Sequence, residues 1–136
     1  MAEAGLPLRA EWCQAVPPGV EIDGGFQAMI QLLDQAERPT GVIAFNDVVA
    51  LGALHAARVR DLRVPQDLSI IGVDDIFAAA HAHPPLTTIN QPKYRMGALA
   101  VQTLRRMKLG EVEAAGSCTV LESPLIVRES TGPAPQ

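Results

Sequence analysis

The stretch of sequence that decides the fold runs from residue 41 to residue 75, GVIAFNDVVALGALHAARVRDLRVPQDLSIIGVDD. Two short apolar runs, Gly41–Phe45 and Leu68–Val73, lie near its ends and do not alternate between apolar and polar residues. Unbroken runs of this length are typical of strands that are covered on both faces, as in parallel sheets. The sequence between them has helical periodicity, so the stretch is predicted to form a strand–helix–strand unit.

The helix of this unit is predicted to begin at Asn46 or Asp47, either of which can cap it, and to end near Asp61. The flanking sequence continues the alternation of helices and strands. Upstream, apolar residues at helical spacing predict a helix that stops before Pro39, with Asp23 as its cap or first-turn acid; these residues are Phe26, Met29, Ile30 and Leu33.

Downstream, the same signals predict four more elements. They are a short helix Phe77–Ala82, a strand Leu86–Asn90, a helix from Pro92 to about Leu109 closed by Gly110, and a broken strand or hairpin over Thr119–Leu121 and Leu125–Arg128. Near the N-terminus we expect the end of a helix at 2–5 and a strand Glu11–Val16. The predicted fold class is α/β, a predominantly parallel sheet with helices on both faces and right-handed crossovers.

The composition excludes several classes of protein. A chain of 136 residues, 48% hydrophobic and 19% charged, fits one globular domain with a core that needs no disulfide or metal. The net charge of -4 argues against a free-standing nucleic-acid-binding protein. No window approaches ~18 uninterrupted apolar residues, and two acidic residues stand where a signal peptide needs positive charge. We therefore expect a cytoplasmic protein.

Polar side chains follow three of the predicted strands. Asn46 follows strand 41–45, Asp74 follows strand 68–73, and Asn90 or Gln91 follows strand 86–90. Ligands of open α/β sheets bind beyond the carboxyl ends of the strands. A carboxylate between two carboxamides suits a neutral polyhydroxylated ligand, because the carboxylate accepts hydrogen bonds from two hydroxyl groups and each amide can both donate and accept.

Each of these positions also has a plain structural alternative. In this alternative, Asn46 and Asp74 are helix caps and nothing more, and Gln91 is an ordinary surface residue. Asp74 and Asp75 are adjacent in the sequence, so their side chains should point to opposite faces and are badly placed to share a substrate.

Motifs for enzymes, metals and cofactors are largely missing. The chain has no GxGxxG, GxxxxGK[ST], GxSxG or HExxH motif, and we predict no catalytic residue, metal site or cofactor. Cys13 and Cys118 stand far apart and are expected to be reduced thiols. Structural or surface roles are expected for the histidines, His55, His81 and His83, and a solvated helix face for the basic residues Lys93, Arg95, Arg105, Arg106 and Lys108.

Several blocks together resemble the LacI/GalR family of bacterial transcriptional repressors. The segment Arg38–Leu54 contains the family signature NDxxAxG as NDVVALG, and the other blocks follow in the family's order over roughly residues 19–131. These blocks are Leu62–Asp75 (ending GVDD), Pro84–Pro92 (PPLTTINQP), Met96-Gly97 and Leu125–Ser130 (LIVRES).

The resemblance implies a fold like that of periplasmic sugar-binding proteins, in which two α/β subdomains enclose an effector cleft and a helix-turn-helix headpiece reads DNA. The positions that match the family's effector contacts are Asn46, Asp74 and Gln91. Val20 falls where many relatives have an aromatic ring that stacks on the ligand, and Lys93 falls at a contact position that is sometimes aromatic, so neither residue supplies a ring for stacking on a sugar. By the same resemblance, residues 47–61 and 76–83 would take part in a homodimer contact, with Leu51, Leu54, His55 and Phe77 as candidates.

The sequence therefore predicts residues 1–131 as the C-terminal effector-binding and dimerising part of a LacI-type regulator, with 132–136 as a disordered tail. The expected effector is a small polar molecule, in particular a carbohydrate, and DNA would be bound only through a headpiece that these residues do not include. The helix 92–112 should pack on an N-terminal subdomain, so its apolar stripe of Met96, Leu99, Ala100, Thr103 and Met107 should be bare here. The alternatives are a solute-binding protein of a transporter with the same fold and a small α/β enzyme using Asp74 and His81.

Overall fold

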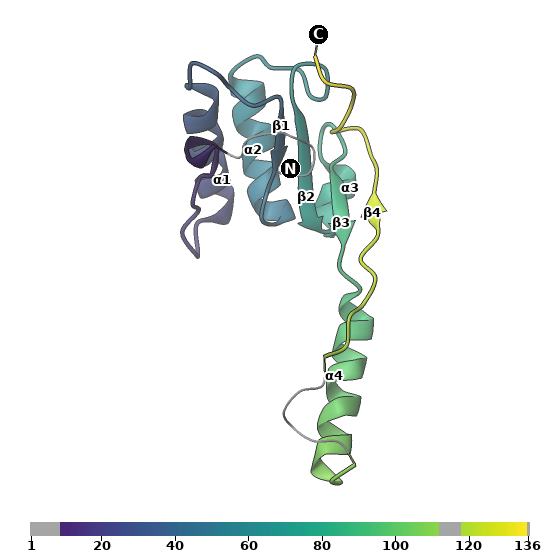
Figure 1. Cartoon of the computed structure of the whole chain (residues 1–136). Coiled ribbons are helices and arrows are strands. Elements are labelled where there is room, and N and C mark those ends of the chain that lie inside the picture. The colour runs from purple at the N-terminus through teal and green to yellow at the C-terminus, as the bar shows by residue number, and fades with distance from the viewer. Residues whose placement is uncertain (1–8, 112–117, 136) are drawn as a thin grey trace.

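The computed structural model describes residues 9–111 and 118–135, which form one four-stranded sheet with the strand order β1-β2-β3-β4 (Figure 1). The strands are β1 (Gly41–Ile43), β2 (Ser69–Asp74), β3 (Thr87–Asn90) and β4 (Leu125–Ile126). β1, β2 and β3 are mutually parallel, and β4 runs antiparallel to β3. The predicted α/β class and predominantly parallel sheet are confirmed.

The helices are α1 (Glu21–Leu33), α2 (Asp47–Val59), α3 (Phe77–His81) and α4 (Lys93–Lys108), preceded by a short 3-10 helix η2 (Ala10–Trp12). α1 and α2 pack side by side, and α2 also packs on β2 (Figure 1). α3 follows β2 in the chain and precedes β3. Each predicted helix from residue 21 onward is therefore present, within a few residues of its expected ends.

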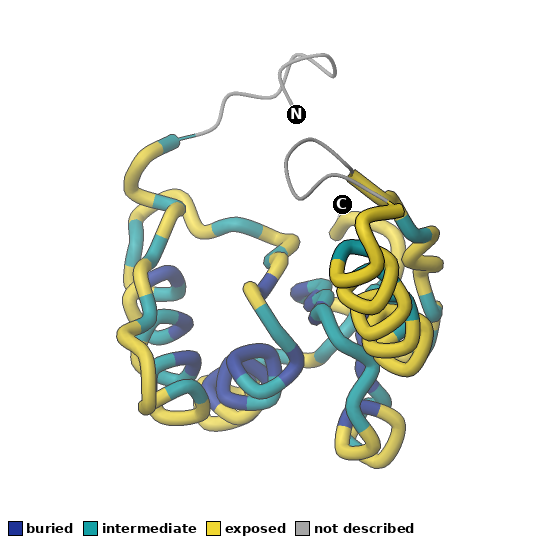
Figure 2. The backbone as a smooth tube through the Cα atoms, turned by 90° about the horizontal axis from the view of Figure 1, so that it is seen from below, coloured by how far each residue is buried: buried dark blue, intermediate teal, exposed yellow. Residues whose placement is uncertain are grey.

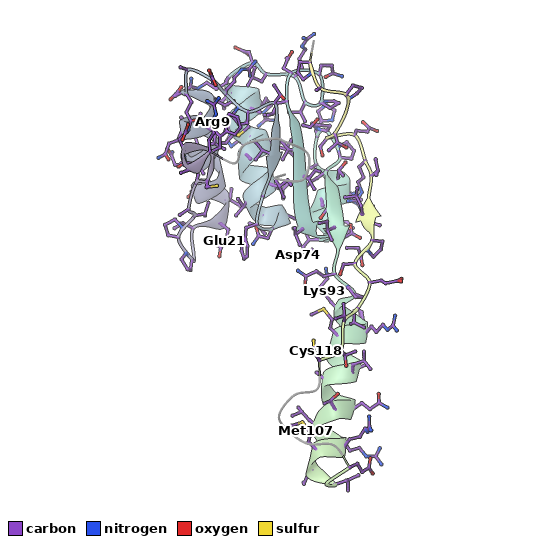
Figure 3. All side chains as sticks on the ribbon, viewed as in Figure 1. Arg9, Glu21, Asp74, Lys93, Met107 and Cys118 are labelled. Carbon is purple, nitrogen blue, oxygen red and sulfur yellow. The ribbon has the colours of Figure 1, made fainter. Side chains whose placement is uncertain are left out.

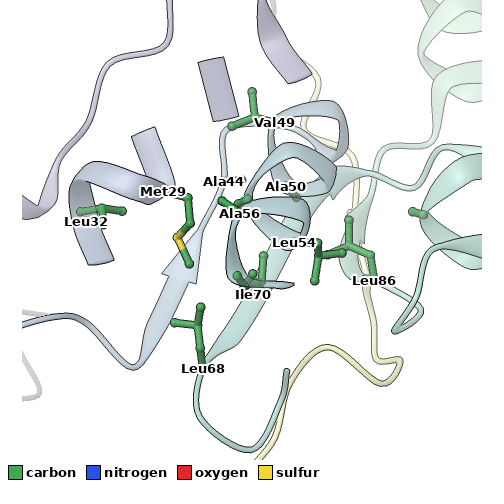
Figure 4. Close-up of a cluster of buried hydrophobic side chains, with 13 residues drawn as sticks. Met29, Leu32, Ala44, Val49, Ala50, Leu54, Ala56, Leu68, Ile70 and Leu86 are labelled. Carbon is green, nitrogen blue, oxygen red and sulfur yellow. The ribbon is translucent and has the colours of Figure 1, made fainter. Parts of the chain in front are cut away.

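The core lies between α2, the facing side of α1 and one face of the sheet (Figure 4). Its largest apolar side chains are Met29, Leu68, Ile70 and Leu86, all completely or almost completely buried. Alanines fill the centre of α2, at Ala50, Ala53, Ala56 and Ala57. Small residues on this helix let the two helices and the sheet approach closely, which is how a short chain reaches native packing density.

Two glycines set the contact between α1 and α2. A Cβ atom on Gly52 would lie 2.1 Å from the Ile22 carbonyl oxygen, and one on Gly25 would lie 2.2 Å from the Val49 carbonyl oxygen. Both distances are far below van der Waals contact with a backbone that cannot move aside. The helices can therefore cross at this distance only because both positions lack a side chain.

The opposite face of the sheet is open at β1. Ala44 is buried, but its neighbours Ile43 and Phe45 are 73% and 79% exposed, so alternate residues of the apolar run point to solvent. Among the described residues, these two side chains are therefore largely uncovered. The sequence pattern predicted that both faces of each strand are covered. For β1, the structure shows a covering layer on one face, and a covering layer on the other face stays a prediction.

The prediction of a strand at Glu11–Val16 is wrong. Ala10–Trp12 form η2, and the residues that follow it are irregular up to the start of α1. A strand forms only where a neighbouring strand pairs with it, whereas here the Trp12 indole nitrogen donates a 3.1 Å hydrogen bond to the Glu37 carbonyl oxygen instead. Thr119–Leu121 is likewise irregular and only Leu125–Ile126 forms a strand, while the helix end expected at 2–5 lies outside the described residues.

α4 projects from the sheet and lies beyond the core (Figure 1). Gly110 follows its C-cap with a φ of +71° and its amide donates to the Met107 carbonyl, which confirms the predicted glycine stop. α4 buries none of its residues (Figure 2). The most exposed apolar side chains of α4 are Tyr94, Val101 and Leu104. These residues do not belong to the apolar stripe predicted from the sequence, in which Leu99, Thr103 and Met107 are half-buried. None of the helices in the described ranges is long and apolar enough to cross a membrane.

Candidate functional site

The carboxyl ends of β1, β2 and β3 meet at one edge of the sheet, because these strands are neighbours and parallel. Asn46 follows β1 at the start of α2, Asp74 is the last residue of β2, and Gln91 follows β3. Asp74 and Asn90 are register partners across β2 and β3. The three residues singled out from the sequence therefore lie at the carboxyl ends of three neighbouring strands. Asp74 lies at the end of the sheet from which α4 leaves (Figure 3).

Asp74 and Gln91 are in direct contact. The Gln91 side-chain amide donates a 2.7 Å hydrogen bond to Asp74 Oδ1, and both residues are half-buried. The chain turns sharply here, with φ values of +116° at Asp74 and +53° at Asp75. Two consecutive non-glycine residues in this region are uncommon and cost free energy, which the surrounding hydrogen bonds must offset.

Lys93 reaches the same turn from the first residue of α4. Its ammonium group donates a hydrogen bond to the Asp74 carbonyl oxygen, while its side chain stays exposed (Figure 3). Val20 is the N-cap residue of α1 and is 45% exposed. The next residue, Glu21, lies at the same end of the molecule as Asp74 (Figure 3). Lys93 is thus joined to the acid–amide pair, whereas Val20 only shares its end of the molecule.

Asn46 caps α2. Its Oδ1 accepts a 2.8 Å hydrogen bond from the Val49 amide, so the capping role considered for this residue is confirmed, while its contact with an effector stays a prediction. The bond uses only the oxygen of the carboxamide. The Nδ2 group remains available to a ligand, and the cap holds the side chain in one orientation.

A second polar cluster lies beside the first and uses the neighbouring residues. The Arg128 guanidinium donates a 2.6 Å hydrogen bond to Asp75 Oδ1, and the Asn90 amide donates a 2.7 Å bond to Asp75 Oδ2. These two bonds hold the pKa of the Asp75 carboxyl below its usual range, the Arg128 bond being the larger cause. Asp74 and Asp75 thus have separate partners, as their adjacency predicted.

The role of Arg128 was not predicted from the sequence. Its guanidinium also donates to the Leu86 carbonyl oxygen at 2.8 Å, so it ties the end of the chain to β3. Within residues 9–111 and 118–135, no protein group hydrogen-bonds Asp74 Oδ2, Gln91 Oε1 or Asn46 Nδ2, and every fully buried side-chain polar atom has a partner. These three atoms therefore reach solvent and can bind the hydroxyl groups of a ligand.

A cavity of about 990 Å³ lies between residues 12–18, α1 and β1, and it reaches Phe45 and Val73, the residues that precede Asn46 and Asp74. Its lining is mostly apolar, including Met29, Leu32, Val42 and Phe45, and contains none of Asn46, Asp74 and Gln91. A polar guest gains little from such walls. The candidate site is therefore the edge of the sheet and not this cavity.

The remaining candidates take ordinary positions. The His81 ring packs edge-on against Phe77, the His55 ring packs against Phe26, and both cysteines are free and exposed. In the part of the chain that the structure describes, no three His, Cys, Asp or Glu residues cluster as metal ligands would. Of the predicted dimer residues, Phe77 is 81% exposed and His55 is exposed, Leu51 is half-buried, and Leu54 belongs to the core.

Residues 1–131 match the family described as periplasmic binding protein-like domain. The chain is 45% identical over 104 residues to the HTH-type transcriptional repressor PurR of Photorhabdus laumondii, covering 76% of the chain and 30% of that protein. It is 40% identical over 130 residues to the ribose operon repressor of Haemophilus influenzae, covering 96% of the chain and 38% of that protein. The chain thus spans about a third of the length of these relatives.

Solved structures agree with these matches. A LacI family transcriptional regulator from Bifidobacterium animalis subsp. lactis superposes with a TM-score of 0.87 at 35% identity, covering 98% of this chain and 46% of that one. The transcriptional regulator CelR in complex with cellobiose gives 0.86 at 36% identity, covering 95% and 38%. The lac repressor dimer bound to operator and an anti-inducer gives 0.76 at 34% identity, covering 82% and 38%.

Proposed function

This chain belongs to the LacI/GalR family of transcriptional regulators through its periplasmic binding protein-like domain, and we propose that it senses a small polar effector. The observation that carries the proposal is the contact between Asp74 and Gln91 at the carboxyl ends of β2 and β3, with the capped Asn46 at the end of β1. This edge is where open α/β sheets bind ligands. The backbone strain at Asp74 adds support, because strained residues cluster at functional sites.

The proposed effector is a carbohydrate. Asp74 Oδ2 would accept hydrogen bonds from hydroxyl groups, Gln91 Oε1 would accept another, and Asn46 Nδ2 would donate one. The names of two relatives point the same way, since one is a ribose operon repressor and another was solved with cellobiose. Val20 and Lys93 complete the proposed contacts, with Lys93 already bonded to the turn at Asp74.

The proposed mechanism is a shift between two arrangements of a cleft. The effector would bind one arrangement more tightly and raise its population, which changes the affinity of a DNA-binding headpiece for its operator. The second wall of the cleft would come from an N-terminal subdomain packed on α4. The exposed Tyr94, Val101 and Leu104 of α4 support this, because apolar side chains in such number on one helix normally have a covering surface.

We also propose a homodimer that uses α2 and the segment around α3. Phe77 and His55 are exposed and Leu51 is half-buried, so these side chains are accessible to a partner. Leu54 is only 7% exposed and would support the contact from inside the core. The dimeric lac repressor is a structural relative in agreement with this. Sedimentation of the Phe77→Asp variant should give a higher proportion of monomer than the unmodified chain.

The curated relatives are repressors, which are not enzymes, and nothing favours the α/β enzyme that was considered with Asp74 and His81. The His81 ring packs on Phe77, and among the described residues neither Asp74 nor His81 has a partner that would activate it as an acid or a base.

Saturation-transfer NMR with D-ribose and cellobiose tests the carbohydrate proposal on this chain. Binding should be detectable but weaker than about 1 μM in Kd, because one wall of the cleft is absent from these residues. Asp74→Asn should remove most of the signal, since it replaces the hydroxyl-accepting carboxylate. Asp34→Asn, which changes an exposed acid at the end of α1, is the matched control and should bind like the unmodified chain. Equal signals for Asp74→Asn and the control, or none with either sugar, would contradict the proposal.

A further inference from the structure

Asp47 is the only acid among the described residues that is completely buried, with 0% of its surface exposed. It lies in the first turn of α2, directly after Asn46. Oδ1 accepts a 2.6 Å hydrogen bond from the Thr88 hydroxyl, and Oδ2 accepts a 2.9 Å bond from the Ile76 amide. Both carboxyl oxygens are therefore bonded to segments outside the helix.

The backbone of β2 leaves room for this carboxyl group. A Cβ atom on Gly72 would lie 2.1 Å from Asp47 Oδ1, so any other residue at that position would displace the acid. The arrangement is unusual for two reasons: a glycine in the middle of a strand weakens the strand, and the burial of an acid costs free energy.

The three bonded segments are those of the proposed effector site. Asn46 precedes Asp47, Ile76 comes two residues after Asp74, and Thr88 comes three residues before Gln91. The Thr88 hydroxyl also accepts a 3.3 Å hydrogen bond from the Asp75 amide. A continuous path of hydrogen bonds thus runs from α2 through β3 to the turn that carries Asp74.

We propose that Asp47 is a positioning residue for the effector site, acting through Thr88 and Ile76 to hold the turn at residues 74–76. The positive φ values of Asp74 and Asp75 make this turn costly, and bonds to the Asp75 and Ile76 amides offset that cost on both sides. With the turn fixed, Asp74 faces Gln91; without it, the acid and the amide separate. This inference rests on the proposed function for its biological meaning, but the positioning can be measured without any ligand.

The test compares two variants of the whole chain, Asp47→Asn and Thr88→Val, by amide hydrogen exchange and by the side-chain amide NMR signals of Gln91. Thr88→Ser keeps the hydroxyl and should behave like the unmodified chain. Ser130→Ala is the matched control, since Ser130 is also completely buried and its hydroxyl also makes two hydrogen bonds, to the Ile70 carbonyl and the Thr87 amide.

The Ile76 amide should exchange at least about fivefold faster in Asp47→Asn, and the Asp75 amide should do so in Thr88→Val, because each variant weakens or removes the acceptor of that amide. The Ala44 amide donates to the Ile71 carbonyl across β1 and β2, and its exchange rate should change only as much as the global stability of the variant changes. The side-chain amide signal of Gln91 should move toward the chemical shift that it has in the unfolded chain. Ser130→Ala should leave Ile76 and Gln91 unchanged. If Asp47→Asn does not fold, Thr88→Val decides alone.

An increase in exchange that is uniform over Ala44, Asp75 and Ile76 would overturn the proposal, since it would make Asp47 a general stabilising residue. Unchanged exchange of the Asp75 and Ile76 amides and an unchanged Gln91 signal would overturn it as well. Titration of the same samples with D-ribose and cellobiose separates the two questions: if the unmodified chain binds neither sugar while the exchange result holds, the carbohydrate proposal fails and the positioning role stands.

Discussion

Gln91 donates its side-chain amide to Asp74 across a separation of 17 residues in the sequence, with 2.7 Å between Nε2 and Oδ1. The bond joins the ends of two parallel strands, and in the part of the chain that the structure describes no protein group hydrogen-bonds the other carboxylate oxygen or the amide oxygen. An acid that is held by one oxygen and open at the other is preorganised, because it needs no rearrangement when the guest arrives.

Replacement of Gln91 by alanine should therefore weaken effector binding without unfolding the protein. Asp74 would lose the bond that orients it, and the guest would lose the Gln91 oxygen, so the Kd for a bound sugar should rise about tenfold. Titration followed by NMR measures this. Gln102→Ala, on the exposed surface of α4, is the control and should leave the Kd unchanged.

The pair Asp75–Arg128 should make stability depend on pH in the acid range. Its side chains are 20% and 18% exposed, and the pKa of Asp75 lies below its ordinary value of 3.8, chiefly through the Arg128 bond and then through Asn90. The unfolded chain therefore takes up a proton at a higher pH than the folded one. The contribution of this ion pair to folding stability is fully present above pH 3.8, and it is lost as the pH falls from 3.8 toward the lowered pKa of Asp75.

Arg128→Met should lower the free energy of unfolding by about 1–2 kcal/mol at pH 7, because the partly buried Asp75 carboxylate loses its charged partner. Urea unfolding at pH 7 and at pH 3 should give a smaller difference between the two pH values for the variant than for the unmodified chain. An equal difference in both proteins would show that Asp75 gains nothing from Arg128.

The capping role of Asn46 and its proposed contact with the effector can be separated by substitution. Asn46→Ala removes the cap of α2 and should cost about 1 kcal/mol of stability. Asn46→Ser keeps a capping oxygen, so its stability should stay near that of the unmodified chain, while the loss of Nδ2 should still weaken sugar binding. Thermal unfolding and the same NMR titration check the pair. A serine variant with normal binding would leave Asn46 as a cap alone.

A matched pair of glycines tests the packing of α1 on α2. Gly52→Ala places a methyl group against the Ile22 carbonyl and should cost about 1–3 kcal/mol. Gly97 lies in α4 with nothing within 4 Å of a Cβ, so Gly97→Ala should instead stabilise that helix by about 0.5–1 kcal/mol. Urea unfolding of both variants provides the comparison, and similar costs at the two positions would refute the close contact.

The sequence was sufficient where the signal is local. The unbroken apolar runs predicted β1 and β2, a further strand was predicted at Leu86–Asn90, and the rule for strand ends selected Asn46, Asp74 and either Asn90 or Gln91. The helix stop at Gly110 was predicted for the same reason, since a glycine that follows helical periodicity has one common use.

Features that depend on distant segments could not be predicted. Arg128 lies 53 residues from Asp75, and no periodicity relates the two positions. The importance of Gly25 and Gly52 depends on where two helices cross. The strand expected at Glu11–Val16 shows the converse, because β-propensity alone does not provide a neighbouring strand for pairing.

The most direct test of the central claim follows the side-chain amide signals of Asn46 and Gln91 in a ¹⁵N-labelled chain during titration with D-ribose and with cellobiose. If these residues and Asp74 hold the effector, both side-chain signals should shift together with increasing concentration of one of the two sugars, and Asp74→Asn should abolish both shifts. Binding that moves signals of other residues while Asn46 and Gln91 stay in place would contradict the account.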